Sequence, residues 1–257
     1  MPRFTTIELE TRRQRHCVCV FVLNEGDRVL RQLEKMRPAC ASIDVILADG
    51  GSTDGSTELE GLRTRGVNTL LVKRGPGKLS AQMRMALAFA LHRGYEGVVT
   101  IDGNNKDNPG AIPLFQDALD RGVDHIQGSR FTSGGHHQNT PLSRLLAVRL
   151  LHAPMISWAA GFHYTDTTNG FRAYGRSFLL NSRVAPFRHV FMRYELHYYL
   201  AIRAGELGYA IEEVPVTRSY PEKGPVVTKL SPLKGNLEIL RALMAAARHR
   251  FDPDPER

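Results

Sequence analysis

The sequence has few cysteines and no long apolar segment. Its three cysteines are too few for a disulfide scaffold, and the pair at positions 17 and 19 lacks the spacing of a zinc knuckle, so we expect thiols buried in the core. The longest uninterrupted apolar run, residues 17–23, is far shorter than the roughly 18 residues that a membrane-spanning helix needs. The first residues also lack the apolar stretch of a secretory signal, and we expect a cytoplasmic protein.

Several enzyme motifs are absent as well. No GxxxxGK[ST] loop occurs, no GxGxxG follows the first predicted strand, and HExxH is missing. No histidine stands at a recognisable triad position. The sequence therefore argues against P-loop nucleotide hydrolysis, dinucleotide-dependent chemistry, zinc-dependent proteolysis and acyl transfer.

Basic residues outnumber acidic ones. Lysine and arginine total 34 against 26 aspartate and glutamate residues, a formal net charge of +8, which predicts an anionic partner: nucleic acid, a phosphorylated small molecule or an acidic lipid surface. A nucleic-acid-binding module would interleave aromatic with basic side chains on one face. Here the aromatic residues are scattered and polar residues gather at predicted strand ends, so we expect no nucleic acid partner.

The first half of the chain repeats strand, polar loop and helix at intervals of about thirty residues. Buried strands are predicted at residues 16–23, 43–48, 68–72 and 97–101, with helices at residues 27–36 and 80–92 among them. This pattern is typical of βαβ units and predicts an α/β fold with a mainly parallel sheet sandwiched by helices. No linker divides the sequence, so we expect a single domain over residues 1–257.

The second half has a different pattern. It is predicted to contain strands at residues 123–127 and 209–216, loops at 131–140 and 219–228, helices at 142–160 and 192–207, a polar turn at 165–174, and a basic terminal helix at 232–249. The segment 142–160 combines apolar residues with Arg144, Arg149 and Trp158. Such a helix either lies in a lipid interface or packs against the sheet, and the composition is compatible with both.

Acidic and amide side chains follow three predicted strands: Asn24 and Glu25, Asp49, and Asp102. Ligands of open α/β sheets bind at the carboxyl ends of the strands. Basic residues follow downstream at Lys78, Arg84, Arg130 and Arg172. Carboxylates accept hydrogen bonds from a base or a ribose and hold hard cations, whereas arginines bind phosphate in a forked geometry. Together these residues predict a site for a nucleotide diphosphate.

The same segments resemble the family 2 glycosyltransferases with a GT-A fold, in particular the dolichyl- or polyprenyl-phosphate sugar transferases. Four elements carry the resemblance in the family's order: residues 21–25 (FVLNE), residues 48–56 (ADGGSTDGS), residues 101–104 (IDGN) at the place of the Asp-x-Asp motif, and residues 128–130 (GSR) with 166–173. The resemblance covers roughly residues 16–216 and implies a Rossmann-like GT-A domain. It divides the chain into a nucleotide-sugar-binding half (16–127), an acceptor-binding half (128–230), and a C-terminal basic helix and tail (231–257).

The resemblance implies transfer of a sugar, with inversion, from a nucleotide-diphosphate donor to an acceptor such as polyprenyl phosphate or another lipid-linked or glycan acceptor. With the basic residues above, the donor-binding set is Asn24, Glu25, Asp49, Lys78, Arg84, Asp102, Gly103 and Asn104. The acceptor-binding set is Arg130, Asn169, Arg172, Lys223 and Lys229. One aspartate at position 49 pairs with either a uracil or a guanine edge, so UDP and GDP donors both fit.

Catalysis in this scheme depends on charge. Asp102 would face the diphosphate, and Arg130 and Arg172 would meet either the acceptor's phosphate or the leaving group, where positive charge stabilises the transition state. A hydroxyl acceptor needs a general base, for which Glu195 is the candidate, whereas a phosphate acceptor is already anionic and needs none.

Two acidic positions of the family are neutral here. Gly50 replaces the second aspartate of the first loop, Asn104 replaces the second aspartate of Asp-x-Asp, and Lys106 stands where the branch often has glutamine. We expect Asp102 and Asn104 to hold Mg²⁺ or Mn²⁺, because magnesium takes several ligands from substrate phosphates and water. The Lys106 ammonium is the alternative source of positive charge.

The neutral positions also define an alternative function, a catalytically degenerate protein that binds sugar nucleotides. A lipid-linked acceptor, by contrast, would bring the chain to the cytoplasmic face of a membrane as a peripheral protein.

Overall fold

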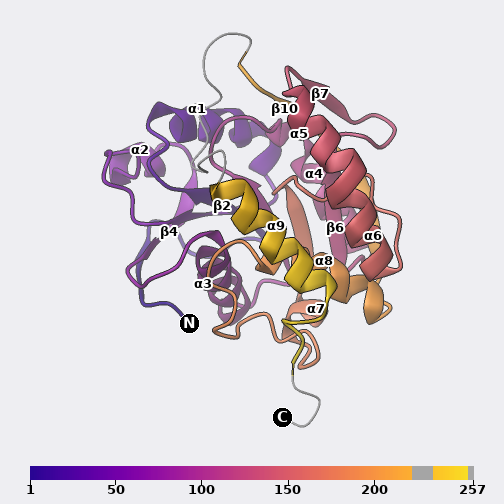
Figure 1. Cartoon of the computed structure of the whole chain (residues 1–257). Coiled ribbons are helices and arrows are strands. Elements are labelled where there is room, and N and C mark those ends of the chain that lie inside the picture. Colours follow the sequence, from indigo (N-terminus) through magenta and orange to yellow (C-terminus); the bar gives the residue numbers. More distant parts are fainter. Residues whose placement is uncertain (222–233, 254–257) are drawn as a thin grey trace.

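An eight-stranded mixed sheet forms the centre of the protein, whose computed structural model describes residues 1–221 and 234–253 (Figure 1). The strands are β1 (Phe4–Glu8), β2 (His16–Val22), β3 (Asp44–Asp49), β4 (Val67–Lys73), β5 (Gly97–Asp102), β6 (His125–Ser129), β8 (Arg172–Gly175) and β9 (Ile211–Pro215). Their order across the sheet is β1-β4-β3-β2-β5-β8-β6-β9. The four adjacent strands β4, β3, β2 and β5 are parallel, which confirms the mainly parallel sheet predicted from the sequence.

Helices cover both faces of this sheet. On one face lie α1 (Asp27–Met36), α2 (Leu59–Arg63) and α4 (Ile112–Asp120), and on the other lie α3 (Leu79–His92), α7 (Arg176–Leu180) and α8 (Leu196–Glu206). Because side chains alternate along a strand, Val18 and Val20 of β2 face the first layer, while Cys17 and Cys19 face the second. Both cysteines are fully buried, as expected from the sequence.

A third layer of helices covers α8 from outside. α5 (Leu142–Ala147), the π-helical turn η3 (Val148–His152) and α6 (Ala153–Ala160) form one rod, and α9 (Lys234–Ala247) lies beside it (Figure 1). Ile156 of α6, Ile202 of α8 and Leu243 of α9 are buried together. A Cβ atom at Gly205 would lie only 1.9 Å from the carbonyl oxygen of Ala160, so this glycine allows α8 to approach the end of α6.

The rod of α5, η3 and α6 has an uncovered outer face. Its inner side chains, such as Val148 and Ile156, are buried, but Leu142, Leu150 and Trp158 are 68%, 73% and 80% exposed. Of the two alternatives predicted for residues 142–160, the helix packed against the sheet is therefore wrong. The inner face of the rod packs on α8, and its outer face is exposed to solvent. No helix within residues 1–221 and 234–253 is long and apolar enough to cross a bilayer.

The largest differences from the predicted elements are short polar strands. β1 was not predicted and pairs antiparallel with β4 at the sheet edge. The predicted polar turn at residues 165–174 ends in β8, which runs antiparallel between β5 and β6. The predicted loop 131–140 contains β7 (His136–Gln138), which pairs in parallel with β10 (Thr217–Ser219). These strands form because a partner strand is close in space, and each is too short to give a clear local signal; β7 is also exposed along its whole length.

Candidate active site

Two loops at the carboxyl ends of β2 and β3 are tied to each other. The side-chain Oδ1 of Asn24 accepts from the Thr53 amide at 2.8 Å, and the Asn24 amide donates to Ser52 Oγ at 2.9 Å. The buried Asp49 carboxylate accepts from the amide of Ser52 at 3.0 Å and from its hydroxyl at 2.6 Å. Asn24 and Asp49 thus shape residues 50–56 in this structure, the loop that the resemblance assigns to the nucleotide.

Gly50, the neutral position of this loop, lies in a crowded place. A Cβ atom there would lie 3.3 Å from the carbonyl oxygen of Val22 and 3.4 Å from Gln82 Oε1. Gln82, on α3, donates through Nε2 to the carbonyl oxygens of Val22 and Ala48 at 2.9 and 2.5 Å. The glutamine therefore joins the ends of β2 and β3 and takes up the space that a larger residue at position 50 would need.

Asp102 ends β5 at the same edge of the sheet, and its side chain is 30% exposed. The Asn104 side chain lies beside it, with Nδ2 3.4 Å from Asp102 Oδ2. A Cβ atom at Gly103 would lie 2.4 Å from Val22 Cγ1, so only glycine fits between the two polar residues. Gly170 allows the opposite loop to approach, since a Cβ atom there would lie 3.0 Å from Asp102 Oδ1. A partly exposed carboxylate and a neighbouring amide fit a hard cation that takes its other ligands from phosphate and water.

Arg218, on β10, joins Asp102 to a second carboxylate. Its Nη2 lies 3.3 Å from Asp102 Oδ2, while its Nη1 donates to Asp107 Oδ2. Arg218 and Asp107 are both buried. Burial raises the pKa of the Asp107 carboxyl above its ordinary value, and the Arg218 charge only partly offsets this effect.

Tyr220 gathers three cations beside this pair. Arg144 Nη1 donates to the Tyr220 hydroxyl at 2.9 Å, Lys106 Nζ lies 5.3 Å from the centre of its ring, and the Arg218 guanidinium lies 5.9 Å from it. Burial by itself would raise the pKa of the Tyr220 hydroxyl, but the charges of Arg218 and Arg144 outweigh it and lower that pKa. Burial and the nearby Arg218 charge lower the pKa of the Lys106 ammonium.

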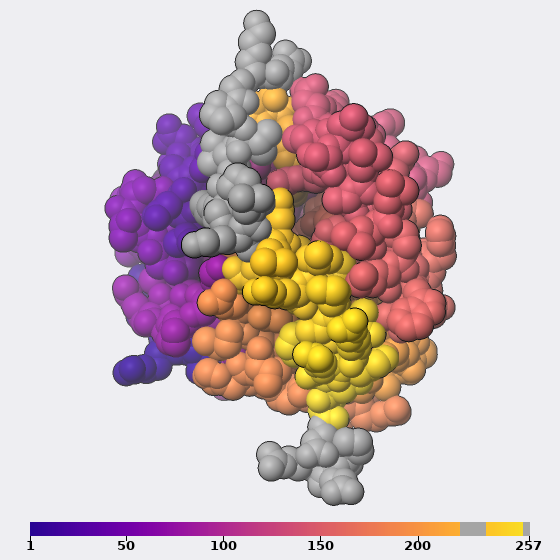
Figure 2. All heavy atoms as spheres, viewed as in Figure 1, coloured from indigo at the N-terminus to yellow at the C-terminus, as the bar shows by residue number. Residues whose placement is uncertain are grey.

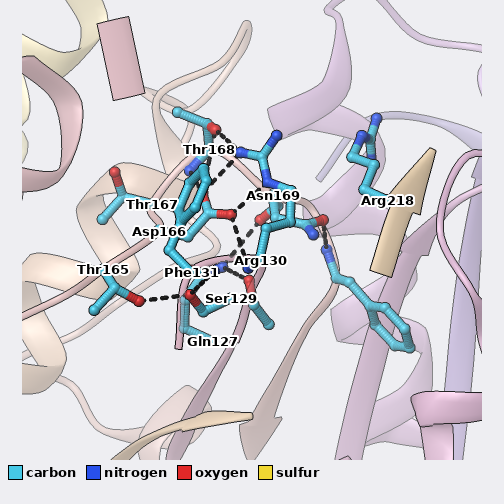
Figure 3. A network of polar contacts seen from close by, with 12 residues as sticks. Gln127, Ser129, Arg130, Phe131, Thr165, Asp166, Thr167, Thr168, Asn169 and Arg218 are labelled. Carbon is cyan, nitrogen blue, oxygen red and sulfur yellow. Dashed lines mark hydrogen bonds and ion pairs between the residues drawn. The ribbon is translucent and has the colours of Figure 1, made fainter. Parts of the chain in front are cut away.

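Arg130 follows β6 and forms a buried ion pair with Asp166 (Figure 3). Its Nε and Nη2 donate to the two carboxylate oxygens at 2.7 and 3.0 Å, and Nη2 also donates to Thr168 Oγ1 at 2.8 Å. The Phe131 ring contacts two guanidinium groups, that of Arg130 at 5.1 Å and that of Arg149 at 4.8 Å from the ring centre. Arg149 belongs to η3, so this contact connects the outer helical rod to Arg130.

Arg172 and Asn169 hold the loop between Asp166 and β8. Arg172 is buried and donates to the backbone carbonyl oxygens of Asn169, Thr167 and His197 at 2.9, 2.6 and 2.6 Å. The Asn169 Oδ1 accepts from the Phe171 amide at 3.0 Å. In this structure Arg172 therefore binds backbone and shapes the loop that presents Gly170 to Asp102.

The remaining predicted residues lie in other surroundings. Arg84 is buried on α3 and donates to the carbonyl oxygens of Phe187 and Phe191, both at 3.2 Å, and Glu25 forms an ion pair with Arg28 at 2.9 Å. Lys78 Nζ lies 2.8 Å from a carboxylate oxygen of Glu238 on α9.

Glu195 precedes α8, and its carboxylate accepts from the Arg193 amide at 2.7 Å. The Lys78 amide donates to the carbonyl oxygen of Met192, so Lys78 lies beside this segment. Lys223 and Lys229 lie outside the described residues.

The structure thus brings Asp102, Asn104 and Arg130 to one region and adds residues that the sequence analysis did not assign to the site. The charge of Arg218 acts on Arg130 and that of Arg130 acts on Asp107, which places the groups near one another. The added residues are Asp107, Arg144, Arg218 and Tyr220. Arg218 falls between the predicted strand 209–216 and the predicted loop 219–228, and only its pairing with Asp107 shows its place.

Comparisons with known proteins fit this geometry, although no model of a known protein family matches the chain. The chain is 28% identical over 222 residues to the polyprenol monophosphomannose synthase of Mycolicibacterium smegmatis, covering 85% of this chain and 82% of that protein. It is 29% identical over 204 residues to the undecaprenyl-phosphate mannosyltransferase of Micrococcus luteus, covering 76% of this chain and 79% of that protein.

A solved structure shows the same fold. Glucosyl-3-phosphoglycerate synthase from Mycobacterium tuberculosis, crystallised with Mn²⁺, uridine diphosphate and glucosyl-3-phosphoglycerate, matches with a TM-score of 0.65 at 17% identity, covering 93% of this chain and 81% of that one. The fold is thus the GT-A fold. Together with the two sugar-transferring relatives it identifies the chain as a glycosyltransferase similar to the polyprenyl-phosphate sugar transferases, in agreement with the resemblance seen in the sequence.

Proposed function

We propose that this glycosyltransferase moves a hexose from a nucleoside-diphosphate sugar to the phosphate of a polyprenyl-phosphate lipid. One observation carries the proposal: four basic side chains gather around Tyr220 and Arg218, beside the partly exposed carboxylate of Asp102. They are Lys106, Arg130, Arg144 and Arg218. A site that binds a diphosphate and a phosphate monoester together must offset several negative charges, and these cations would do so together with the divalent metal.

On the donor side, Asp102 and Asn104 are the residues that would hold Mg²⁺ or Mn²⁺. The bound cation would neutralise charge on the leaving diphosphate. The related synthase crystallised with Mn²⁺ and uridine diphosphate supports this assignment. The Asn24–Asp49 loop would border the base, and Lys106 lies close enough to Asp102 for its charge to act there.

On the acceptor side, a phosphate oxygen would attack the anomeric carbon while its bond to the donor diphosphate breaks, which inverts that carbon. A phosphate oxygen is already anionic, so the step needs no general base. Arg144 and Arg218, joined through Tyr220, would orient this anion, and the Asp166 carboxylate would keep Arg130 in place. The two mannosyl-transferring relatives make GDP-mannose the first donor to test.

The acceptor lipid also gives a role to the open face of α5 and α6. The rod of α5, η3 and α6 lies at the surface of the molecule, where its atoms are rose-coloured (Figure 2). Its exposed side chains include Leu142, Leu146, Leu150 and Trp158, with the exposed Arg149 among them. Apolar side chains beside a cation, on a protein of net charge +8, match the surface of an anionic bilayer. Because Arg144 on the same rod reaches Tyr220, a bilayer at this face would lie next to the acceptor cations.

Transfer to lipid tests the proposed reaction. The protein is incubated with undecaprenyl phosphate, Mn²⁺ and radiolabelled GDP-mannose or UDP-glucose, and label is counted after extraction into organic solvent. We expect label in the lipid fraction and a loss of at least about 100-fold in D102A. Label that stays in the aqueous phase for every donor, but is transferred to 3-phosphoglycerate, would overturn the lipid acceptor.

Flotation tests the membrane surface separately. We expect the wild type to float with vesicles containing phosphatidylglycerol, and the variant L150E/W158E to remain behind. L180E is the matched control, because Leu180 is also exposed but lies on α7. Failure of the wild type to float at low salt would exclude this surface as a membrane contact.

A further inference from the structure

Arg218 holds two carboxylates with one guanidinium group. Its Nη1 is bound to Asp107, which is buried, and its Nη2 reaches Asp102 Oδ2 at 3.3 Å. Asp102 is the more exposed partner, with 30% of its side chain accessible against none for Asp107. The contact with Asp107 is therefore the protected end of the pair, and the contact with Asp102 is the end that solutes can reach.

The oxygen that Arg218 approaches is also the one beside Asn104. Asp102 Oδ2 lies 3.3 Å from Arg218 Nη2 and 3.4 Å from Asn104 Nδ2. A divalent cation bound by the Asp-Gly-Asn turn would take this carboxylate as the one charged ligand from that turn, because Asn104 is neutral. Two positive groups cannot share one carboxylate oxygen at contact distance without strong repulsion, and an arginine does not lose its charge.

We propose that Arg218 is a built-in counter-cation that competes with the divalent metal for Asp102. This inference rests on the proposed function, since it concerns the metal of that reaction. Metal alone binds weakly because it must displace Nη2 from Asp102. Metal that arrives with a nucleoside diphosphate binds well, because the phosphates give the displaced guanidinium a new anionic partner.

Asp107 limits how far the Arg218 guanidinium can move during this competition. It keeps one nitrogen of Arg218 bound while the other leaves Asp102, so the guanidinium stays within reach of both the carboxylate and a diphosphate. Such an arrangement favours loading of metal and donor together and disfavours a metal-loaded site without donor. Coupling of this kind must be reciprocal, so metal tightens donor binding by the same factor.

Direct Mn²⁺ titration, read from the electron paramagnetic resonance signal of the free ion, tests the competition without measuring activity. R218Q alone leaves Asp107 buried without its cation, which threatens folding. The double variant D107N/R218Q removes both charges and keeps a hydrogen-bonding pair, so its net charge equals that of the wild type. R121Q is the control for removing an arginine away from the site, because Arg121 pairs with Glu212 at the surface.

Without nucleotide, we expect D107N/R218Q to bind Mn²⁺ about 10-fold more tightly than the wild type and R121Q to match the wild type. With saturating GDP or UDP we expect the order to reverse, because the variant has lost a partner for the diphosphate. A thermal melt confirms that each variant is folded. Unchanged or weaker Mn²⁺ binding by the double variant, in a protein whose wild type still transfers sugar, would overturn the competition and leave the proposed function standing. Absence of sugar transfer by the wild type would instead overturn the proposed function, whatever the Mn²⁺ affinities are.

Discussion

Arg144 donates a hydrogen bond of 2.9 Å to the hydroxyl oxygen of Tyr220. Arg144 belongs to the helical rod with the open apolar face, and Tyr220 follows the strand that carries Arg218. This contact joins the surface proposed to meet the membrane to the cations proposed to meet the acceptor. The acceptor phosphate and its lipid chain would therefore be recognised by one continuous part of the structure.

The first prediction concerns this contact. Y220F removes the acceptor of the Arg144 hydrogen bond and leaves the ring against Lys106 and Arg218. We expect the KM for undecaprenyl phosphate to rise about 3- to 10-fold, with little change in the KM for the nucleotide sugar. Steady-state kinetics with each substrate varied in turn measure both constants. Y209F is the control, because the Tyr209 hydroxyl bonds Asn181 elsewhere, and an equal effect of both variants would contradict the prediction.

The second prediction concerns Glu195. If the acceptor is a phosphate, no group needs to remove a proton from it, and E195Q should retain kcat within about 3-fold of the wild type. The Glu195 carboxylate accepts from the Arg193 amide, a role that the glutamine oxygen can keep. Single-turnover transfer to lipid measures the effect. A loss of kcat of about 100-fold or more that is relieved at high pH would identify Glu195 as a general base and a hydroxyl as the acceptor.

The third prediction concerns the buried pair of Arg130 and Asp166. D166A leaves the Arg130 guanidinium buried without its carboxylate, so we expect the free energy of unfolding to fall by about 3–5 kcal/mol. Urea denaturation followed by circular dichroism measures this change. E10A breaks the exposed pair of Glu10 and Arg13 and should leave the free energy of unfolding nearly unchanged. A loss in D166A no larger than in E10A would show that the buried pair adds nothing to stability.

The fourth prediction concerns pH. Burial lowers the pKa of His125 from its ordinary 6.5 to about 3, with a smaller contribution from the charge of Arg172. The unfolded chain therefore binds a proton at His125 below pH 6.5 that the folded chain does not bind until about pH 3. Stability is present above pH 6.5 and is lost as the pH falls, by about 1.4 kcal/mol per pH unit for this residue.

The variant H125Q tests that slope. Urea denaturation at pH 7.5, 6.5 and 5.5 should show a shallower loss of stability in H125Q than in the wild type, because glutamine takes up no proton. H163Q is the comparison, since His163 is exposed. If H125Q and the wild type lose stability in parallel below pH 6.5, the protons are taken up elsewhere.

Much of the donor side of the site was predictable from local sequence. Short apolar runs followed by polar residues place Asn24, Asp49 and Asp102 at strand ends, and parallel strands bring those ends to one edge of a sheet. The structure confirms this placement because it depends only on strand direction. The binding roles of these residues stay predictions, and Asn24 and Asp49 are seen here bonding the loop that follows β3.

The roles of the basic residues were less predictable. Arg172, expected at the acceptor, and Arg84, expected at the donor, are both buried and bound to backbone carbonyl oxygens. An arginine on a phosphate and an arginine on a carbonyl look the same in a sequence, because both use the same five donors. Conversely, Arg218 has no motif around it, and its role follows from Asp107, which is 111 residues away in the chain.

By itself, the sequence determined the class of fold, the polar edge of the sheet and the basic character of its partner surface, because hydrophobic periodicity, strand-end polarity and net charge are properties of local segments. Only the tertiary structure decided which cations lie near Asp102 and which donate to backbone carbonyl oxygens instead. It also decided that leucine side chains of the rod of α5, η3 and α6 are exposed to solvent. Those outcomes depend on which distant segments meet, and that is set by packing of the whole chain.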